Sequence, residues 1–316
     1  MRKIWSPGGA SIRLWVIAVL ALLGGGCGQS QGPGNATAAA ASPPDASARV
    51  IDIALPWAGP EIFVEGAHFA VEEINRAQGL GKTRLRVKEH RPAPSNTAEA
   101  SGAALALRAI ESKERAVKTA QALAAKAPFA VVGHGEQNAA IPAANVYERS
   151  ERLFLSPTGK ENRLTDLGLE YIFRILPNNT VFGRRTADYC FHRGYRRMAI
   201  LHDRTPGSYE LIDAFQSQAL DVHGMEIGFL RSFFPNIGER EVTRLAVLLR
   251  RARPFDAVLL VTNDELGHRL YAESRRRWIE VPFIGSEDMD TGPFWQNIET
   301  WSEVHGMAAD ITIPTV

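Results

Sequence analysis

The chain has 316 residues, with 36 Lys or Arg and 35 Asp or Glu, which gives a formal charge of +1. A balance this even provides no electrostatic field for nucleic acid or for an anionic membrane surface, so we expect neither as a partner. The only cysteines are Cys27 and Cys190. If Cys27 is modified, as argued next, no disulfide or cysteine metal site remains, and we expect Cys190 to be a small buried hydrophobic side chain on a helix.

Residues 1–26 have the pattern of an export signal. Arg2, Lys3 and Arg13 flank the start of an apolar run over 14–23, and three glycines then precede Cys27. The run is ten residues long, whereas a membrane-spanning helix needs roughly 20, so we expect cleavage. Small residues before a cysteine resemble a bacterial lipobox, which implies lipidation of Cys27. The alternative is ordinary cleavage near Gly26 that leaves Cys27 free.

Residues 27–48 are predicted to be a lipid-anchored, flexible tether. They are rich in Gly, Ser, Pro and Ala and contain almost no large apolar side chain, so they cannot bury enough surface to offset the entropy of ordering. The roughly 270 residues that follow are more than one hydrophobic core usually spans, which predicts two lobes.

Strands and helices alternate along the rest of the chain. In the first lobe, residues 49–176, we expect strands at 49–55, 85–89, 129–133, 153–156 and 171–175 and helices at 66–77, 96–127 and 139–149. In the second lobe, residues 177–304, we expect helices at 181–192, 209–223, 239–251 and 265–278 and strands at 197–202, 226–233, 257–261 and 281–285. This alternation predicts an α/β fold in which each lobe is a parallel sheet wrapped by helices.

Several ordered segments resemble the leucine/isoleucine/valine-binding proteins of ABC importers, a family of type I periplasmic solute-binding proteins. The matching segments are Gly59-Pro60, Glu65 to Asn75, Val131 to His134, Pro142-Ala143, Tyr147-Glu148, Leu155 to Pro157, Arg163 to Thr165, His202-Asp203 and Phe283 to Glu287. The resemblance implies two Rossmann-like lobes, joined by crossover hinge strands, that close on a ligand. Residues 305–316 match the second crossover strand back toward lobe 1. The family continues beyond this point, so either the sequence is truncated or the first lobe lacks its C-terminal part.

The resemblance also implies which residues meet the ligand. Gln137, with Asn138 beside it, stands where the family binds a carboxylate through a serine, and Thr158 stands where a backbone group contributes. Lys160 replaces a hydroxyl donor of the family by a cation, and Glu287 coincides with the acid that binds the ligand's ammonium group. We therefore expect a small polar ligand with its positive group on Glu287 and its anionic group near Lys160. Alternatively, Lys160 is neutralised by Glu136, and Glu287 caps a helix.

Three further contacts carry over less directly. Tyr209 lies two residues after the position of a family aromatic, Asn263 lies near a family tyrosine, and Trp57 is the only aromatic residue of the first loop. Each of the three is equally compatible with an ordinary loop position.

An enzyme would need a catalytic constellation, and none assembles. Gly133, Gly135 and Asn138 follow a strand as in a dinucleotide loop, but Asn replaces the third glycine. Asp288 and Asp290 resemble an aspartate pair of phosphoryl-transfer hydrolases, yet a solvated loop next to Glu287 explains them far better. The eight histidines are dispersed without a local ligand pair. We therefore expect no enzymatic activity, no cofactor and no metal.

The predicted function is that of an extracytoplasmic solute-binding protein of an ABC transporter, which captures an amino acid, an amide or a similar small ligand between its lobes. Its expected partners are the ligand and an ABC permease, with membrane contact only through the lipid on Cys27, in the periplasm or at the cell surface. We expect a monomer. The alternative is a ligand-sensing or degenerate binding lipoprotein that is not coupled to transport.

Overall fold

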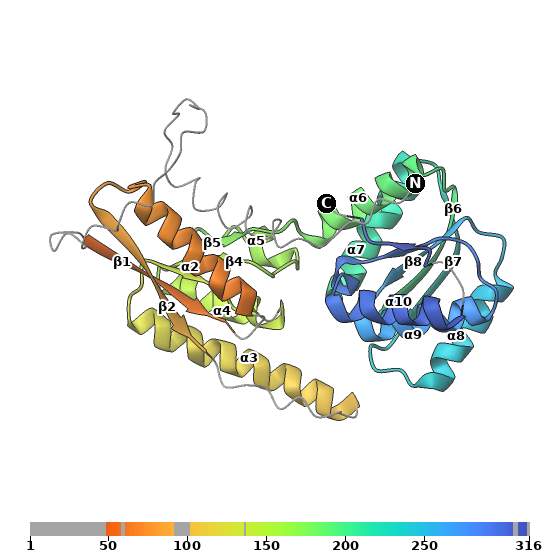
Figure 1. The fold of residues 1–316 in the computed structure, drawn as a ribbon, viewed down its shortest axis with the longest axis horizontal. Helices are drawn as coiled ribbons and strands as arrows, with labels where there is room; N and C mark the ends of the chain where they lie inside the picture. The colour runs from red at the N-terminus through yellow and green to blue at the C-terminus, as the bar shows by residue number, and fades with distance from the viewer. Residues whose placement is uncertain (1–48, 58–60, 92–101, 136, 306–308, 315–316) are drawn as a thin grey trace. The chain divides into compact units, whose positions relative to one another are not determined.

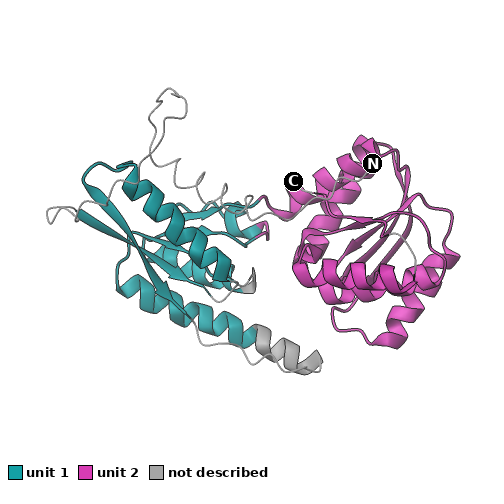
Figure 2. Cartoon of the chain, viewed as in Figure 1, with its two compact units in different colours: residues 1–159, 163–176 teal, residues 160–162, 177–316 magenta. Residues whose placement is uncertain are grey.

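The computed structural model describes residues 49–57, 61–91, 102–135, 137–305 and 309–314. The chain divides into two compact units, shown in Figure 2. The boundary runs through the polypeptide at three places, because residues 160–162 belong to the second unit although the chain on either side of them belongs to the first. Unit 1 ends at Leu176, and unit 2 continues from Pro177.

Unit 1 is built on a parallel sheet (Figure 1). Its strands lie in the order β2-β1-β3-β4-β5 and all pair in parallel. They are β1 (Arg49–Pro56), β2 (Thr83–His90), β3 (Ala130–Val132), β4 (Leu153–Ser156) and β5 (Ile172–Arg174). The helices are α2 (Glu61–Arg76), α3 (Gly102–Ala125), α4 (Gln137–Arg149) and the short α5 (Arg163–Asp166).

The two faces of this sheet pack against different helices. Successive side chains of a strand point to opposite faces, so Ile53 and Ala54 of β1 enter separate cores. Ile53 packs with Val71 of α2, whereas Ala54 belongs to the cluster that contains Tyr147 of α4 and Leu123 of α3. Helix α2 therefore covers one face, and α3 and α4 cover the other.

Unit 2 repeats this arrangement. Its strands lie in the order β10-β9-β8-β6-β7 and pair in parallel. They are β6 (Arg197–Asp203), β7 (Glu226–Phe233), β8 (Ala257–Val261), β9 (Phe283–Gly285) and β10 (Ile311–Thr312). The helices are α6 (Asn179–His192), α7 (Pro206–Ser217), α8 (Glu239–Arg251), α9 (Asp264–Arg276) and α10 (Gly292–His305), and a π-helical turn, Gln218–Val222, extends α7.

The central strands of unit 2 are buried on both faces. In β6, Met198 and Ile200 pack against α6 and α7, while Ala199 and Leu201 pack in the cluster with α8, α9 and α10. Cys190 lies in the α6 side of this core as a fully buried free thiol, as expected, and burial raises its pKa to about 12.

The structure confirms the predicted α/β fold with two parallel sheets, and it corrects some element boundaries. The helix expected at 209–223 begins earlier, at Pro206, because Thr205 caps it by accepting from the backbone N–H of Ser208. Helix α10 was not predicted, although Phe294, Ile298 and Trp301 recur on its buried face.

Helices α6 and α7 approach each other closely at Gly183. A Cβ at this position would lie 2.9 Å from both the Ala214 Cβ and the Phe215 nitrogen. In α2, by contrast, a Cβ on Gly66 would meet nothing within 4 Å. A methyl group would therefore clash at Gly183 and would have free space at Gly66.

We predict that Gly183→Ala destabilises the protein by about 1–3 kcal/mol, because the added methyl overpacks the contact between the helices. The matched control, Gly66→Ala, should stabilise it by about 0.5–1 kcal/mol, because alanine loses less entropy in a helix than glycine does. Calorimetric unfolding measures both variants. A Gly183→Ala protein as stable as the unmodified protein would contradict the close approach.

Candidate ligand-binding site

The carboxyl ends of the unit 2 strands carry a group of polar residues. Asp203 ends β6, Asn263 follows β8 and begins α9, and Glu287 follows β9 in a short helical turn, Glu287–Met289. Open α/β sheets place ligands at this edge. This edge therefore brings several of the predicted contact residues of unit 2 together with Asp203.

Lys160 belongs to unit 2 through its backbone as well as its side chain. Its carbonyl accepts from the backbone N–H of Asn179 at 3.0 Å. Two residues later, the Asn162 N–H donates to a Glu210 carboxylate oxygen at 3.0 Å, and the Asn162 amide donates to the Thr180 hydroxyl at 2.8 Å. The segment 160–162 is thus fastened to the first turns of α6 and α7.

The side chain of Lys160 is 7% exposed and pairs with two carboxylates. Its Nζ lies 2.8 Å from Glu287 Oε1 and 2.5 Å from Asp288 Oδ1, and 5.9 Å from the centre of the Phe182 ring. Burial alone would lower the pKa of Lys160, but the two carboxylates outweigh burial and raise it. Lys160 is therefore a buried ammonium ion held by Glu287 and Asp288, which we call the acidic pair.

The turn that carries the acidic pair is itself fixed to the sheet. The Ser286 N–H donates to the Leu260 carbonyl at 3.0 Å, and the Ser286 hydroxyl donates to the Thr262 carbonyl at 3.3 Å. Met289 is fully buried. The side chain of Glu287 keeps 21% exposure and that of Asp288 45%, so neither is fully removed from solvent.

The structure pairs two of the predicted contact residues, Lys160 and Glu287, with each other. Glu287 was predicted to receive a positive group of the ligand, and Lys160 to lie near an anionic group. Both ligand contacts stay predictions. The sequence interpretation had weighed Glu136 as the neutralising partner of Lys160, but Glu136 lies outside the described residues.

Tyr209 offers an exposed aromatic ring on α7 of unit 2. The residue is 43% exposed, and its ring meets the buried imidazole of His202 edge to face, with the ring centres 5.1 Å apart. Asp203 fixes the start of the same helix, because its carboxylate accepts from the hydroxyls of Thr205 at 2.7 Å and Ser208 at 2.6 Å. Tyr209 is thus held on a capped helix and remains open to a solute.

The side chain of Asn263 caps the amino-terminal end of α9. Its side-chain oxygen accepts from the backbone N–H of Leu266 at 2.9 Å, which caps the first turn of α9. Its amide nitrogen is the group that a ligand could still use.

The predicted contacts of unit 1 are distributed over two loops. Thr158 donates its hydroxyl to the His134 carbonyl at 3.1 Å. Trp57 is 7% exposed and stacks on Phe63, with ring centres 3.8 Å apart, so its ring packs in the core. Helix α4 begins at Gln137 and includes Asn138, but the side chains of both residues lie outside the described part, as does Cys27.

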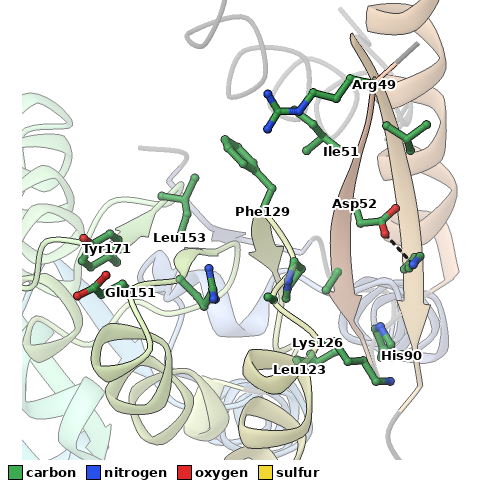
Figure 3. Close-up of a pocket in the computed structure, with 16 residues that line it drawn as sticks. Arg49, Ile51, Asp52, His90, Leu123, Lys126, Phe129, Glu151, Leu153 and Tyr171 are labelled. Atoms are coloured by element: carbon green, nitrogen blue, oxygen red, sulfur yellow. Dashed lines mark ion pairs between the residues drawn. The ribbon is translucent and has the colours of Figure 1, made fainter. Parts of the chain in front are cut away.

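A separate cavity of ≈ 670 Å³ lies in unit 1 (Figure 3). Arg49, Phe129, Leu153 and Tyr171 line it at the amino-terminal ends of their strands. It is therefore on the edge of the sheet opposite to the one where such folds place ligands. Asp52 lines it too and pairs with Arg86 and Lys88, which lower its pKa to about 2.

Among the described residues, no helix is both long and apolar enough to cross a bilayer. The same residues contain no group of three or more His, Cys, Asp or Glu side chains placed to hold a metal ion.

We predict that Lys160→Met lowers the free energy of unfolding by about 1–3 kcal/mol at pH 7, because it leaves the partly buried acidic pair without its cation. Since folding raises the pKa of Lys160 above its usual 10.5, the stabilisation is complete below about pH 10.5 and is lost as the pH rises through the folded-state pKa. The difference between the two proteins should therefore stay constant from pH 7 to 9 and shrink above pH 10.5. Calorimetry over this range measures it.

The matched control is Lys113→Met, which removes an exposed lysine on α3 and should change stability by less than about 0.5 kcal/mol. Equal stability of Lys160→Met and the unmodified protein at pH 7 would show that the ion pair contributes nothing.

Comparison with known proteins assigns the chain to a family. Residues 65–286 match the receptor family ligand binding region. The Leu/Ile/Val-binding protein homolog 1 of Brucella abortus is 23% identical over 211 residues, which are 64% of this chain and 51% of that protein. The chain thus spans about half the length of this curated relative.

Two solved structures share the fold. An ABC transporter substrate-binding protein from Desulfitobacterium hafniense in complex with Leu has a TM-score of 0.62 at 22% identity, covering 83% of this chain and 79% of that one. The branched-chain amino acid transporter substrate binding protein LivJ from Streptococcus pneumoniae, in complex with isoleucine, also has a TM-score of 0.62, at 17% identity over 84% and 70% of the two chains. Since this family match covers most of the sequence, the chain belongs to the family described as the receptor family ligand binding region.

Proposed function

We propose that this protein is an extracytoplasmic solute-binding protein of an ABC transporter, which captures a small polar solute of the size of an amino acid or an amide. Three observations support the proposal: the family, the two α/β units with parallel sheets, and the names of the relatives, which include leucine-, isoleucine- and valine-binding proteins. The receptor would pass its solute to an ABC permease.

The observation that carries the proposal is the polar group at the carboxyl edge of the unit 2 sheet. A buried ammonium ion and two partly exposed acidic side chains lie on fixed turns, and the exposed Tyr209 lies on the capped helix α7. These groups are well suited to orient a small polar molecule. Nothing in this group requires a reaction, because ions, hydrogen-bond donors and an aromatic face suffice for recognition. Unit 1 would add contacts from Thr158 and from Gln137 and Asn138 at the start of α4.

The same proposal includes the location of the protein. The signal-like residues 1–26 would direct export, a lipid on Cys27 would hold the protein at a membrane, and residues 27–48 would tether it as a monomer. The membrane contact would then depend on the lipid alone.

Isothermal titration calorimetry tests the binding function. The purified protein is titrated with pools of amino acids, amides and short-chain carboxylates, and one pool should give saturable heat with one site per chain. Thermal unfolding in the presence of the same pool should shift upward, because a ligand that binds only the folded state stabilises it. Folded protein that gives no heat with any pool would argue against a receptor.

Labelling with an alkyne analogue of palmitate tests the anchor. In a bacterial host the unmodified protein should incorporate the label, and Cys27→Ser should lose it completely, because the thiol that carries the lipid is gone. Cys190→Ala is the matched control and should keep the label, since Cys190 is buried. Retention of the label in Cys27→Ser would refute lipidation at this residue.

A further inference from the structure

We propose that Lys160 determines specificity by serving as a built-in ammonium group on Glu287, so that the site selects solutes that carry no ammonium group of their own. This inference rests on the proposed function and narrows its ligand class. The expected solutes are neutral amides and carboxylates without an amine, with an oxygen that accepts a hydrogen bond from Lys160.

The carboxylate of Glu287 is already occupied by the ammonium group of Lys160. Glu287 is the carboxylate that follows β9 at the carboxyl edge of unit 2, where a ligand amine would find a charge-assisted partner. In the structure, the Nζ of Lys160 already lies 2.8 Å from Glu287 Oε1. An amine of the ligand would therefore compete with a group that is covalently part of the protein.

Lys160 cannot leave the acidic pair easily. Its side chain is 7% exposed, and its backbone is held in unit 2 by Asn179. A ligand amine that took Glu287 would leave this buried cation with Asp288 as its one remaining partner of the acidic pair, which is unfavourable. The backbone of residues 160–162 is also held in place, because Asn162 donates hydrogen bonds to both Thr180 and Glu210.

Lys160 still offers one N–H donor to a ligand. An ammonium group has three N–H donors and no acceptor. Glu287 and Asp288 take two of these donors, which leaves one to donate to a carbonyl or carboxylate oxygen of a solute. An amine has no lone pair to accept this bond when it is protonated, whereas an amide or a carboxylate has one.

The occupancy is tested by chemical rescue. Lys160→Ala removes the ammonium and leaves space along its path, and propylammonium chloride should raise the unfolding temperature of this variant more than an equal concentration of potassium chloride does. Neither the unmodified protein nor Lys160→Met, which fills the space without a charge, should respond in this way. The double variant Lys160→Ala and Glu287→Gln should also fail to respond, because the carboxylate that binds the amine is gone.

The selectivity is tested by calorimetry with matched solutes: leucine against 4-methylpentanoate and its amide, and phenylalanine against 3-phenylpropanoate and its amide. The unmodified protein should bind the amine-free member of a set at least tenfold more tightly than the amino acid. Lys160→Ala should lose this preference or reverse it.

The outcomes separate the inference from the proposed function. If propylammonium fails to stabilise Lys160→Ala, or if the unmodified protein binds an amino acid as tightly as its amine-free counterpart, the inference is overturned. If propylammonium does stabilise Lys160→Ala but no solute in any set or pool binds the unmodified protein, the receptor function falls while the occupancy of Glu287 by Lys160 stands.

Discussion

Burial of both faces of the central strands of the unit 2 sheet is the constraint on which its polar groups depend. Strands β6 and β8 send alternate side chains into two separate helical layers, so the middle of each strand carries only apolar side chains. Parallel strands also end at a common edge. The polar groups of unit 2 are therefore concentrated at the turns after its strands, where Asp203, Asn263 and Glu287 lie.

Much of the fold could be predicted because buried strands have a simple signature. Residues 257–261 are all apolar and all buried, and the predicted strand has the observed bounds. Helix α10 was not predicted, although its buried residues Phe294, Ile298 and Trp301 have helical spacing. The periodic signal was therefore present in the sequence.

The site was less predictable, for a physical reason. The contact between Lys160 and Glu287 joins residues that are 127 positions apart, and no local pattern of side chains encodes such a pairing. Resemblance indicated each position separately and supplied each with a role toward a ligand. It could not show that the two side chains pair with each other, because that depends on the distance between them. The same limit applies to Asn263, whose side chain caps α9.

Lys160 and a ligand amine compete for the carboxylate of Glu287, and entropy decides this competition as much as charge does. Both would bring the same chemical group to Glu287, but the lysine has lost its translational freedom by being part of the chain, and the hydrogen bonds of Asn162 and Asn179 restrict it further. A free amine must supply that ordering from its own binding energy. It must also take Glu287 from Lys160, which then keeps Asp288 alone of the acidic pair. A solute that brings only an acceptor avoids both demands, because it adds a hydrogen bond to a charge that is already neutralised.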